Sequence, residues 1–143
     1  MKVLVDTNVV LDILLHRQPW YTDAVLIFGM TQRNLIKSYI TASAITDIFY
    51  IAQKQLGKKA TQEAMKWLLG VFQPATVTDN NIYQALDLEW DDFEDSVQYV
   101  VGDGLYVDCI ITRNIKDFAF GSINAITPEQ FIQNLEGEED DEN

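Results

Sequence analysis

The chain has 143 residues, a length that fits one domain with a substantial core. Its hydrophobic content of 48% is typical of a folded globular protein rather than a disordered one. The net charge of −12 at pH 7 argues against a protein that coats nucleic acid nonspecifically, because an acidic surface repels phosphates unless cations mediate the contact.

The residue counts exclude several further classes of site. The lone Cys109 lies in an apolar run, so we expect a buried core thiol and no intramolecular disulfide. One cysteine and the single His16 do not suffice for a zinc site or a serine triad. The sequence contains no glycine-rich phosphate loop, signal peptide or long apolar run. We therefore expect a cytoplasmic protein with no membrane contact.

The first residues, MKVLVDTNVVLD, predict a buried strand, a polar turn and then a helix. In a parallel α/β sheet, the turn after a strand faces the crevice in which ligands bind. This places Asp6 at the floor of a cleft. Asp6 also suits the start of a helix, where a carboxylate accepts free backbone N–H groups. The stretch alone leaves both interpretations open.

Predicted helices and strands alternate along the rest of the chain. Apolar spacing predicts helices over residues 21–32, 43–56, 61–72, 82–88, 97–101 and 128–135, and strands over 35–41, 75–77, 106–112 and 123–126. This alternation predicts one domain over residues 1–135, a three-layer α/β/α sandwich with a mostly parallel central sheet. Residues 136–143 contain six acids, and we expect them to form a disordered, solvated tail.

Side chains with oxygen ligands occur beside the ends of separate predicted elements: Asp6, Asp47, Glu94, Asp95, Asn114 and Asp117. Buried carboxylates repel one another, so a convergent cluster needs a cation or shared protons. All-oxygen ligands suit Mg²⁺ or Mn²⁺. The alternative for Asp47 and Asp95 is an ordinary solvated acid in the first turn of a helix.

Four segments carry a likeness to a known family: VLVDTNVVLD, TASAITD, DFEDSVQ and DCIITRNIKDF. With them the chain resembles the PIN domains, metal-dependent ribonucleases that include many VapC-like toxins of bacterial toxin–antitoxin pairs. The family's first and third acids fall on Asp6 and Asp95. Its second acid is usually Glu, and here Asp47 stands in that position. The fourth position holds Asn114, with Asp117 as a later acid.

The resemblance implies metal-assisted hydrolysis of RNA. Asp6, Asp47 and Asp95 would hold one or two Mg²⁺ or Mn²⁺ ions, and Asp117 would complete the catalytic acids. Arg113 and Lys116 would contact phosphate. Other residues would orient the ligands from behind: Thr7, Asn8, Glu94, Thr112 and Asn114.

The resemblance also implies RNA as substrate and an antitoxin protein as partner, and we expect a homodimer or higher homo-oligomer. The alternative is a non-catalytic module on the same fold that binds nucleic acid or protein. The shorter acid Asp47 and the amide Asn114 motivate this alternative. A phosphatase with Asp6 as nucleophile is disfavoured, because Asn8 stands where such a site commonly has a second Asp.

Overall fold

The computed structural model describes the backbone of residues 1–142 and the side chains of residues 1–137. Within these residues the strands are β1 (Lys2–Val5), β2 (Lys37–Thr41), β3 (Gln73–Ala75), β4 (Cys109–Ile111) and β5 (Ala125–Ile126). The α-helices are α1 (Thr7–Leu14), α2 (Tyr21–Gln32), α3 (Ala42–Leu56), α4 (Lys58–Leu69), α5 (Asp79–Asp87), α6 (Phe93–Gly104) and α7 (Pro128–Glu142). A 3-10 helix, η1 (Ile115–Phe118), follows β4.

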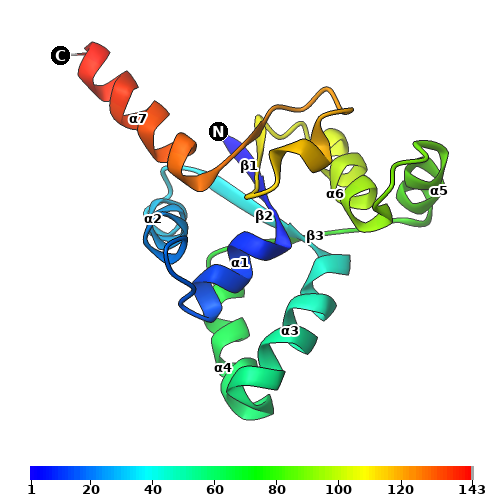
Figure 1. Ribbon diagram of the computed structural model, residues 1–143, viewed down its shortest axis with the longest axis horizontal. Coiled ribbons are helices and arrows are strands. Elements are labelled where there is room, and N and C mark those ends of the chain that lie inside the picture. Colours follow the sequence, from blue (N-terminus) through cyan, green and yellow to red (C-terminus); the bar gives the residue numbers. More distant parts are fainter. Residues whose placement is uncertain (143) are drawn as a thin grey trace.

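The strands form one parallel sheet in the order β3-β2-β1-β4-β5, of which β1, β2 and β3 are labelled in Figure 1. The chain runs outward from β1 through β2 to β3, and then returns to place β4 on the other side of β1. The carboxyl ends of β1 and β4 therefore flank the point at which the strand order reverses, where parallel α/β sheets form their ligand crevice. The predicted α/β fold with a parallel central sheet is confirmed.

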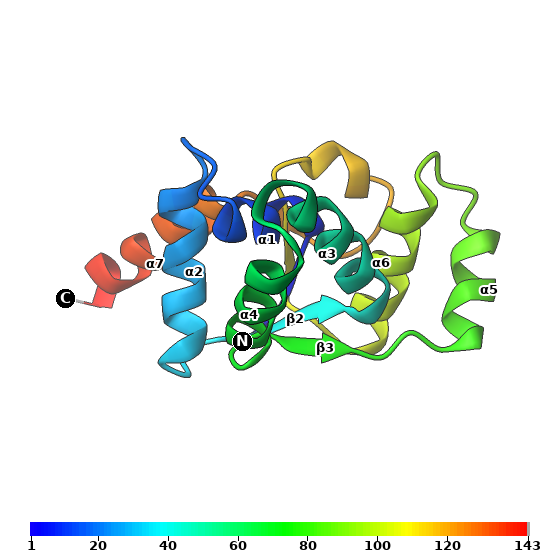
Figure 2. The same ribbon diagram turned by 90° about the horizontal axis from the view of Figure 1, so that it is seen from below.

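Alternation along β1 sends its side chains into two separate cores. Val3 and Val5 pack with apolar residues of α1 to α4 and α7, whereas Leu4 packs with residues of α5 and α6. Each side chain is fully buried, which stabilises the fold by roughly 1.5–3 kcal/mol relative to an exposed position. The sheet thus lies between two helical layers (Figures 1 and 2).

Strands β2 to β5 all differ by a few residues from their predicted bounds, and both β2 and β5 begin two residues later than predicted. Strand β3 ends at Ala75, two residues earlier than predicted, and includes Pro74; proline is tolerated there because β3 is an edge strand. Strand β4 is shorter than predicted and begins at Cys109. The Asp108 backbone N–H donates to the Lys2 carbonyl at 2.8 Å, and the Asp108 carboxylate accepts the Lys2 backbone N–H at 2.8 Å.

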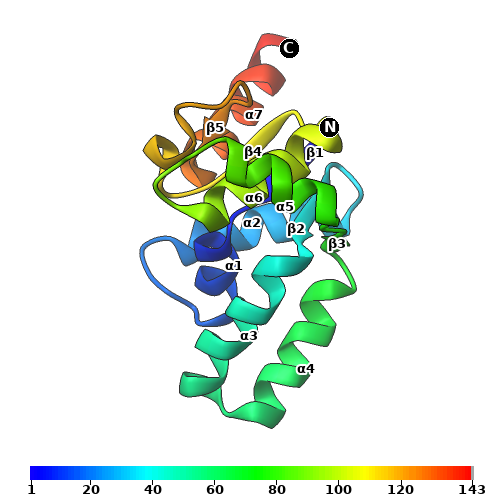
Figure 3. The same cartoon turned by 90° about the vertical axis from the view of Figure 1, so that its right-hand side faces the viewer.

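Two helical segments extend away from the sheet. Helices α3 and α4 lie side by side and project together (Figures 1 and 3), joined at Gly57, whose φ of 83° favours glycine. Helix α7 continues to Glu142, so the backbone of residues 136–142 is helical where we expected a disordered tail. Glutamate is a good helix former, which suits this extension. Asn143 lies outside the described residues.

No helix among the described residues is long and apolar enough to cross a lipid bilayer.

Candidate active site at the carboxyl edge of the sheet

Asp6 joins the end of β1 to the start of α1 and is almost completely buried, at 5% exposure. Its Oδ1 accepts hydrogen bonds from the Thr7 backbone N–H at 2.7 Å and from Gln98 Nε2 at 3.0 Å. Its Oδ2 accepts one from Thr112 Oγ1 at 2.7 Å. Asp6 is therefore the helix cap of α1 and also the centre of a polar network from three elements. Neutral donors hold the carboxylate, and no cation among the described side chains neutralises it.

The first turn of α6 brings Glu94 and Asp95 to the same crevice. Asp92 caps this helix by accepting the Asp95 backbone N–H at 3.0 Å. Burial raises the pKa of Asp95 to about 7, and the negative charges of Asp92, Asp6, Asp117 and Glu94 add to that rise. This crowding indicates a site that a positive charge would stabilise.

Glu94 joins the cluster from the neighbouring position. Burial raises its pKa, a hydrogen bond from the Thr7 hydroxyl lowers it, and the charges of Asp47, Asp6 and Asp92 raise it. The Thr7 Oγ1 atom donates to Glu94 Oε1 at 3.0 Å. Asp47 is thus close enough to repel Glu94, although its own side chain on α3 is exposed.

The carboxylates are close enough to repel one another, but they are not grouped as a complete set of metal ligands. In residues 1–137, no three acidic, histidine or cysteine side chains are grouped closely enough to hold a metal ion as they stand. Asp47 and Asp117 are exposed and Asp95 is half-buried, so none of these three side chains is fixed by complete burial. The donors are all oxygens, which fits Mg²⁺ or Mn²⁺ and not zinc.

The turn after β4 supports the crevice from the other side. Thr112 is fully buried; its hydroxyl donates to Asp6 and accepts the Asn114 backbone N–H at 3.0 Å. The Asn114 side chain itself is exposed at the start of η1, which carries Asp117. Asn8, predicted to orient ligands, lies half-buried in the first turn of α1.

The two predicted phosphate contacts have different surroundings. The Arg113 guanidinium lies 3.0 Å from a carboxylate oxygen of Asp12 and 3.9 Å above the ring of Trp20. Asp12 is fully buried; burial raises the pKa of its carboxyl, and Arg113 and Arg17 lower it. Lys116, on η1, is exposed. Of these two basic side chains, Lys116 is therefore the more accessible to a phosphate.

Gln98 and Asp12 were not predicted as partners of the site. Gln98 lies three residues after Asp95 and four after Glu94, the spacing that places side chains on one helix face. Asp12 is an acid within an apolar helical run, and such a position indicates a buried, paired charge. Both patterns can be seen in the sequence, but neither one identifies the partner, which is Asp6 for Gln98 and Arg113 for Asp12.

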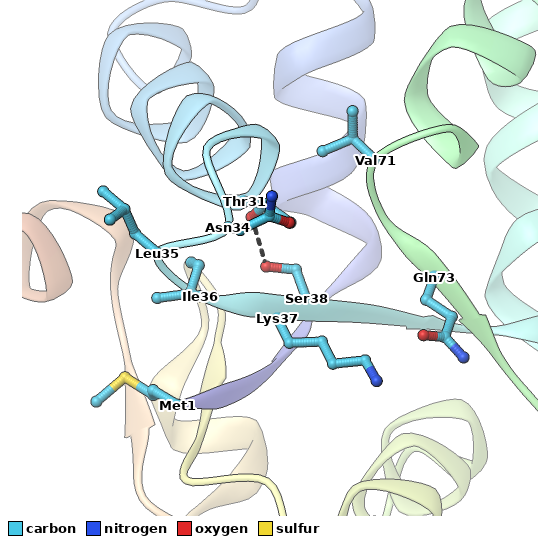
Figure 4. A pocket seen from close by; sticks show the side chains of 9 residues that line it. All are labelled: Met1, Thr31, Asn34, Leu35, Ile36, Lys37, Ser38, Val71 and Gln73. Atoms are coloured by element: carbon cyan, nitrogen blue, oxygen red, sulfur yellow. Dashed lines mark hydrogen bonds between the residues drawn. The ribbon is translucent and has the colours of Figure 1, made fainter.

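A pocket of about 350 Å³ lies at the opposite edge of the sheet (Figure 4). It is lined at the amino ends of β1 and β2 by Met1, Lys37 and Ser38, among others. The Ser38 and Thr31 hydroxyls hydrogen-bond each other at 2.7 Å inside it. None of its lining residues is acidic, so this pocket is separate from the carboxylate crevice.

A family model described as the PIN domain matches residues 2–116. No curated protein matches the chain.

Three solved structures share the fold. VapBC2 from Rickettsia felis, bound to a DNA fragment from its promoter, has a TM-score of 0.68 at 14% identity, covering 89% of this chain and 98% of that one. VapC20 of Mycobacterium tuberculosis, a toxin that cleaves the sarcin-ricin loop, has a TM-score of 0.68 at 14% identity, covering 83% and 95%. A toxin–antitoxin complex from Klebsiella pneumoniae has a TM-score of 0.66 at 21% identity, covering 88% and 97%.

Proposed function

We propose that this chain, which belongs to the PIN-domain family, is a divalent-metal-dependent endoribonuclease that hydrolyses RNA phosphodiester bonds. The observation that supports this most is the placement of Asp6. It is a buried carboxylate held by neutral donors beside two acids whose pKa values are raised by burial and by neighbouring negative charge. Such a crevice favours a cation, and a bound cation would attract the phosphate that an acidic surface otherwise repels.

The residues have separate tasks in this proposal. Asp6, Asp47 and Asp95 would hold Mg²⁺ or Mn²⁺, which lowers the pKa of a bound water and stabilises charge on the phosphate. Thr112 keeps Asp6 oriented, and Thr7 keeps Glu94 oriented, through the hydrogen bonds described above. Lys116 would contact the RNA backbone from η1, next to Asp117 in the chain.

A cleavage assay tests the activity. Purified protein should cut RNA in Mg²⁺ or Mn²⁺, and Asp6→Asn should abolish cutting because it removes the central negative ligand while preserving size. Asp103→Asn is a matched control, since Asp103 is an exposed acid on α6 away from its first turn. Cutting by Asp6→Asn at the level of the unchanged protein would refute the proposal.

We further propose that the chain is the toxin of a toxin–antitoxin pair in the cytoplasm. The fold shared with VapBC2 and the Klebsiella pneumoniae complex supports this. Exposed aromatic residues on the projecting α3–α4 pair, Tyr50 and Trp67, offer apolar area for an antitoxin or a second copy of the chain. Expression should arrest growth, Asp6→Asn should not, and co-expression of a small neighbouring gene should restore growth. Light scattering would test the expected homo-oligomer.

The second candidate is a non-catalytic binding module on this fold. The exposure of Asp47 and the lack of a closely grouped ligand set in residues 1–137 favour it. Calorimetric titration with Mn²⁺ separates the two candidates. Heat that disappears in Asp6→Asn supports the nuclease, and absence of Asp6-dependent heat supports the binding module.

A further inference from the structure

Gln98 is a buried polar residue on α6, exposed by only 1%. It lies among apolar neighbours such as Val97 and Val101, which pack into the core between α6 and the sheet. Its Nε2 donates to Asp6 Oδ1 at 3.0 Å. A glutamine at this depth therefore contributes a specific polar contact and not merely volume.

The orientation of the Gln98 amide is determined by Asp6. Its other polar atom, Oε1, is buried and has no hydrogen-bond partner among the described residues. Buried polar atoms are almost always paired, so an unpaired one calls for a reason. Turning the amide over would bring Oε1 against a carboxylate oxygen, and two acceptors repel each other. The Nε2 donor therefore faces Asp6, and the Oε1 acceptor has no hydrogen-bond partner among the described residues.

The bond also joins two halves of the acidic cluster. Of the three donors to Asp6, Thr7 belongs to α1 and Thr112 follows β4, whereas Gln98 comes from the helix that carries Glu94 and Asp95. The contact therefore connects α6 directly to the carboxylate at the end of β1. The only other side-chain hydrogen bond found between α1 and α6 in the described residues is the half-buried one from Thr7 to Glu94.

We propose that Gln98 is a positioning residue that fixes the Asp6 carboxylate relative to the acids of α6 and thereby sets the cation affinity of the crevice. This inference rests on the proposed metal-dependent function. Gln98 acts through Asp6 and touches neither cation nor RNA. Residues that orient metal ligands from behind commonly change metal affinity 10–100-fold when they are replaced.

The test uses Gln98→Met, which keeps length and bulk but removes the donor. Calorimetric titration of the metal-free protein with Mn²⁺ should show a Kd raised roughly 10–100-fold. Gln62→Met, at an exposed position on α4, should leave the Kd unchanged. In RNA cleavage, Gln98→Met should raise the Mn²⁺ concentration needed for half-maximal rate and leave the KM for RNA unchanged. A Kd within twofold of the unchanged protein would overturn the proposal.

A measurement without metal distinguishes failure of this inference from failure of the proposed function, and it does not require Gln98→Met to fold. In the unchanged protein, nuclear magnetic resonance should find the Gln98 side-chain amide protons protected from solvent exchange, and Asp6→Asn should shift them. If the protein binds no Mn²⁺ while this coupling holds, the proposed function fails and the Asp6–Gln98 contact stands. Rapid exchange, or no shift, would overturn the role of Gln98.

Discussion

Asp6 and Asp12 are both buried aspartates at the start of the chain, with exposures of 5% and 0%, yet their charges are compensated differently. Asp6 accepts hydrogen bonds from a backbone N–H, an amide and a hydroxyl, none of which is charged. Asp12 faces the guanidinium of Arg113 at 3.0 Å. One carboxylate keeps its negative charge available, and the other is neutralised within the fold.

Consecutive residues after β4 produce this difference. The Thr112 hydroxyl donates to Asp6, and the guanidinium of the next residue, Arg113, pairs with Asp12. Dipolar donors stabilise an anion without cancelling its charge, so Asp6 remains able to bind a cation, whereas an ion pair cannot attract one as strongly. We therefore regard Asp6 as a site residue and Asp12 as a structural one.

The largest predicted effect concerns stability, and the isosteric pair Asp12→Asn and Asp6→Asn measures it. Asp12→Asn leaves the half-buried Arg113 without its anionic partner and should lower the free energy of unfolding by about 3–5 kcal/mol. Asp6→Asn, measured without metal, should change it by no more than about 1 kcal/mol, because its donors are neutral and repulsion from nearby acids is relieved. Denaturant unfolding measures both variants.

The double variant Asp12→Leu with Arg113→Met serves as the control for this pair. Replacing both ions by apolar groups should recover most of the lost stability, since neither charge is left buried alone. Equal destabilisation by Asp6→Asn and Asp12→Asn would contradict the division into a site residue and a structural one.

A smaller effect is expected at Thr112, which hydrogen-bonds Asp6 and directly precedes Arg113 in the chain. Thr112→Val removes a donor to Asp6 and the acceptor of the Asn114 N–H, so unfolding free energy should fall by about 1–3 kcal/mol. Mn²⁺ affinity should fall about 10-fold in calorimetry because Asp6 is less well held. Thr22→Val, at an exposed position on α2, is the control. Unchanged Mn²⁺ affinity in Thr112→Val would argue against the orienting role.

The smallest effect is a pH dependence at Asp95, whose pKa is raised to about 7 in the folded chain against an ordinary value of 3.8. The folded state then binds more protons than the unfolded state between these values, so stability should fall as pH rises from about 4 to 7. Asp95→Asn should flatten this slope, raising the Tm of the metal-free protein at pH 8 and not at pH 4. Partial exposure of Asp95 keeps the change modest. An unaltered slope in Asp95→Asn would show that other groups cause it.

The local parts of this arrangement could be predicted from sequence. The apolar run before Asp6 and the apolar spacing after it specify a strand, a turn and a helix, and alternation of elements specifies a parallel sheet. The crevice follows because the carboxyl ends of such strands share an edge. Asp92 as the cap of α6 was also predictable, because the acid directly precedes the helix.

The long-range pairings could not be predicted in the same way. The bonds from Gln98 to Asp6 and from Arg113 to Asp12 join residues about a hundred positions apart, and no local periodicity encodes such a partner. Arg113 shows the consequence: the family resemblance implied a phosphate contact for it, and no local pattern indicated that its guanidinium would lie against Asp12 and Trp20. Local patterns identify which residues are polar and buried, and the tertiary fold decides which of them meet.

In the proposed function, Asp6, Asp47 and Asp95 together bind one or two divalent cations. Crystals soaked in Mn²⁺ and measured near the manganese absorption edge test it most directly. We predict one or two anomalous peaks coordinated by Asp6 and Asp95, with Asp47 turned toward them, and loss of these peaks in Asp6→Asn. Crystals at saturating Mn²⁺ with no peak beside Asp6, and with Asp47 and Asp95 unliganded, would contradict the account.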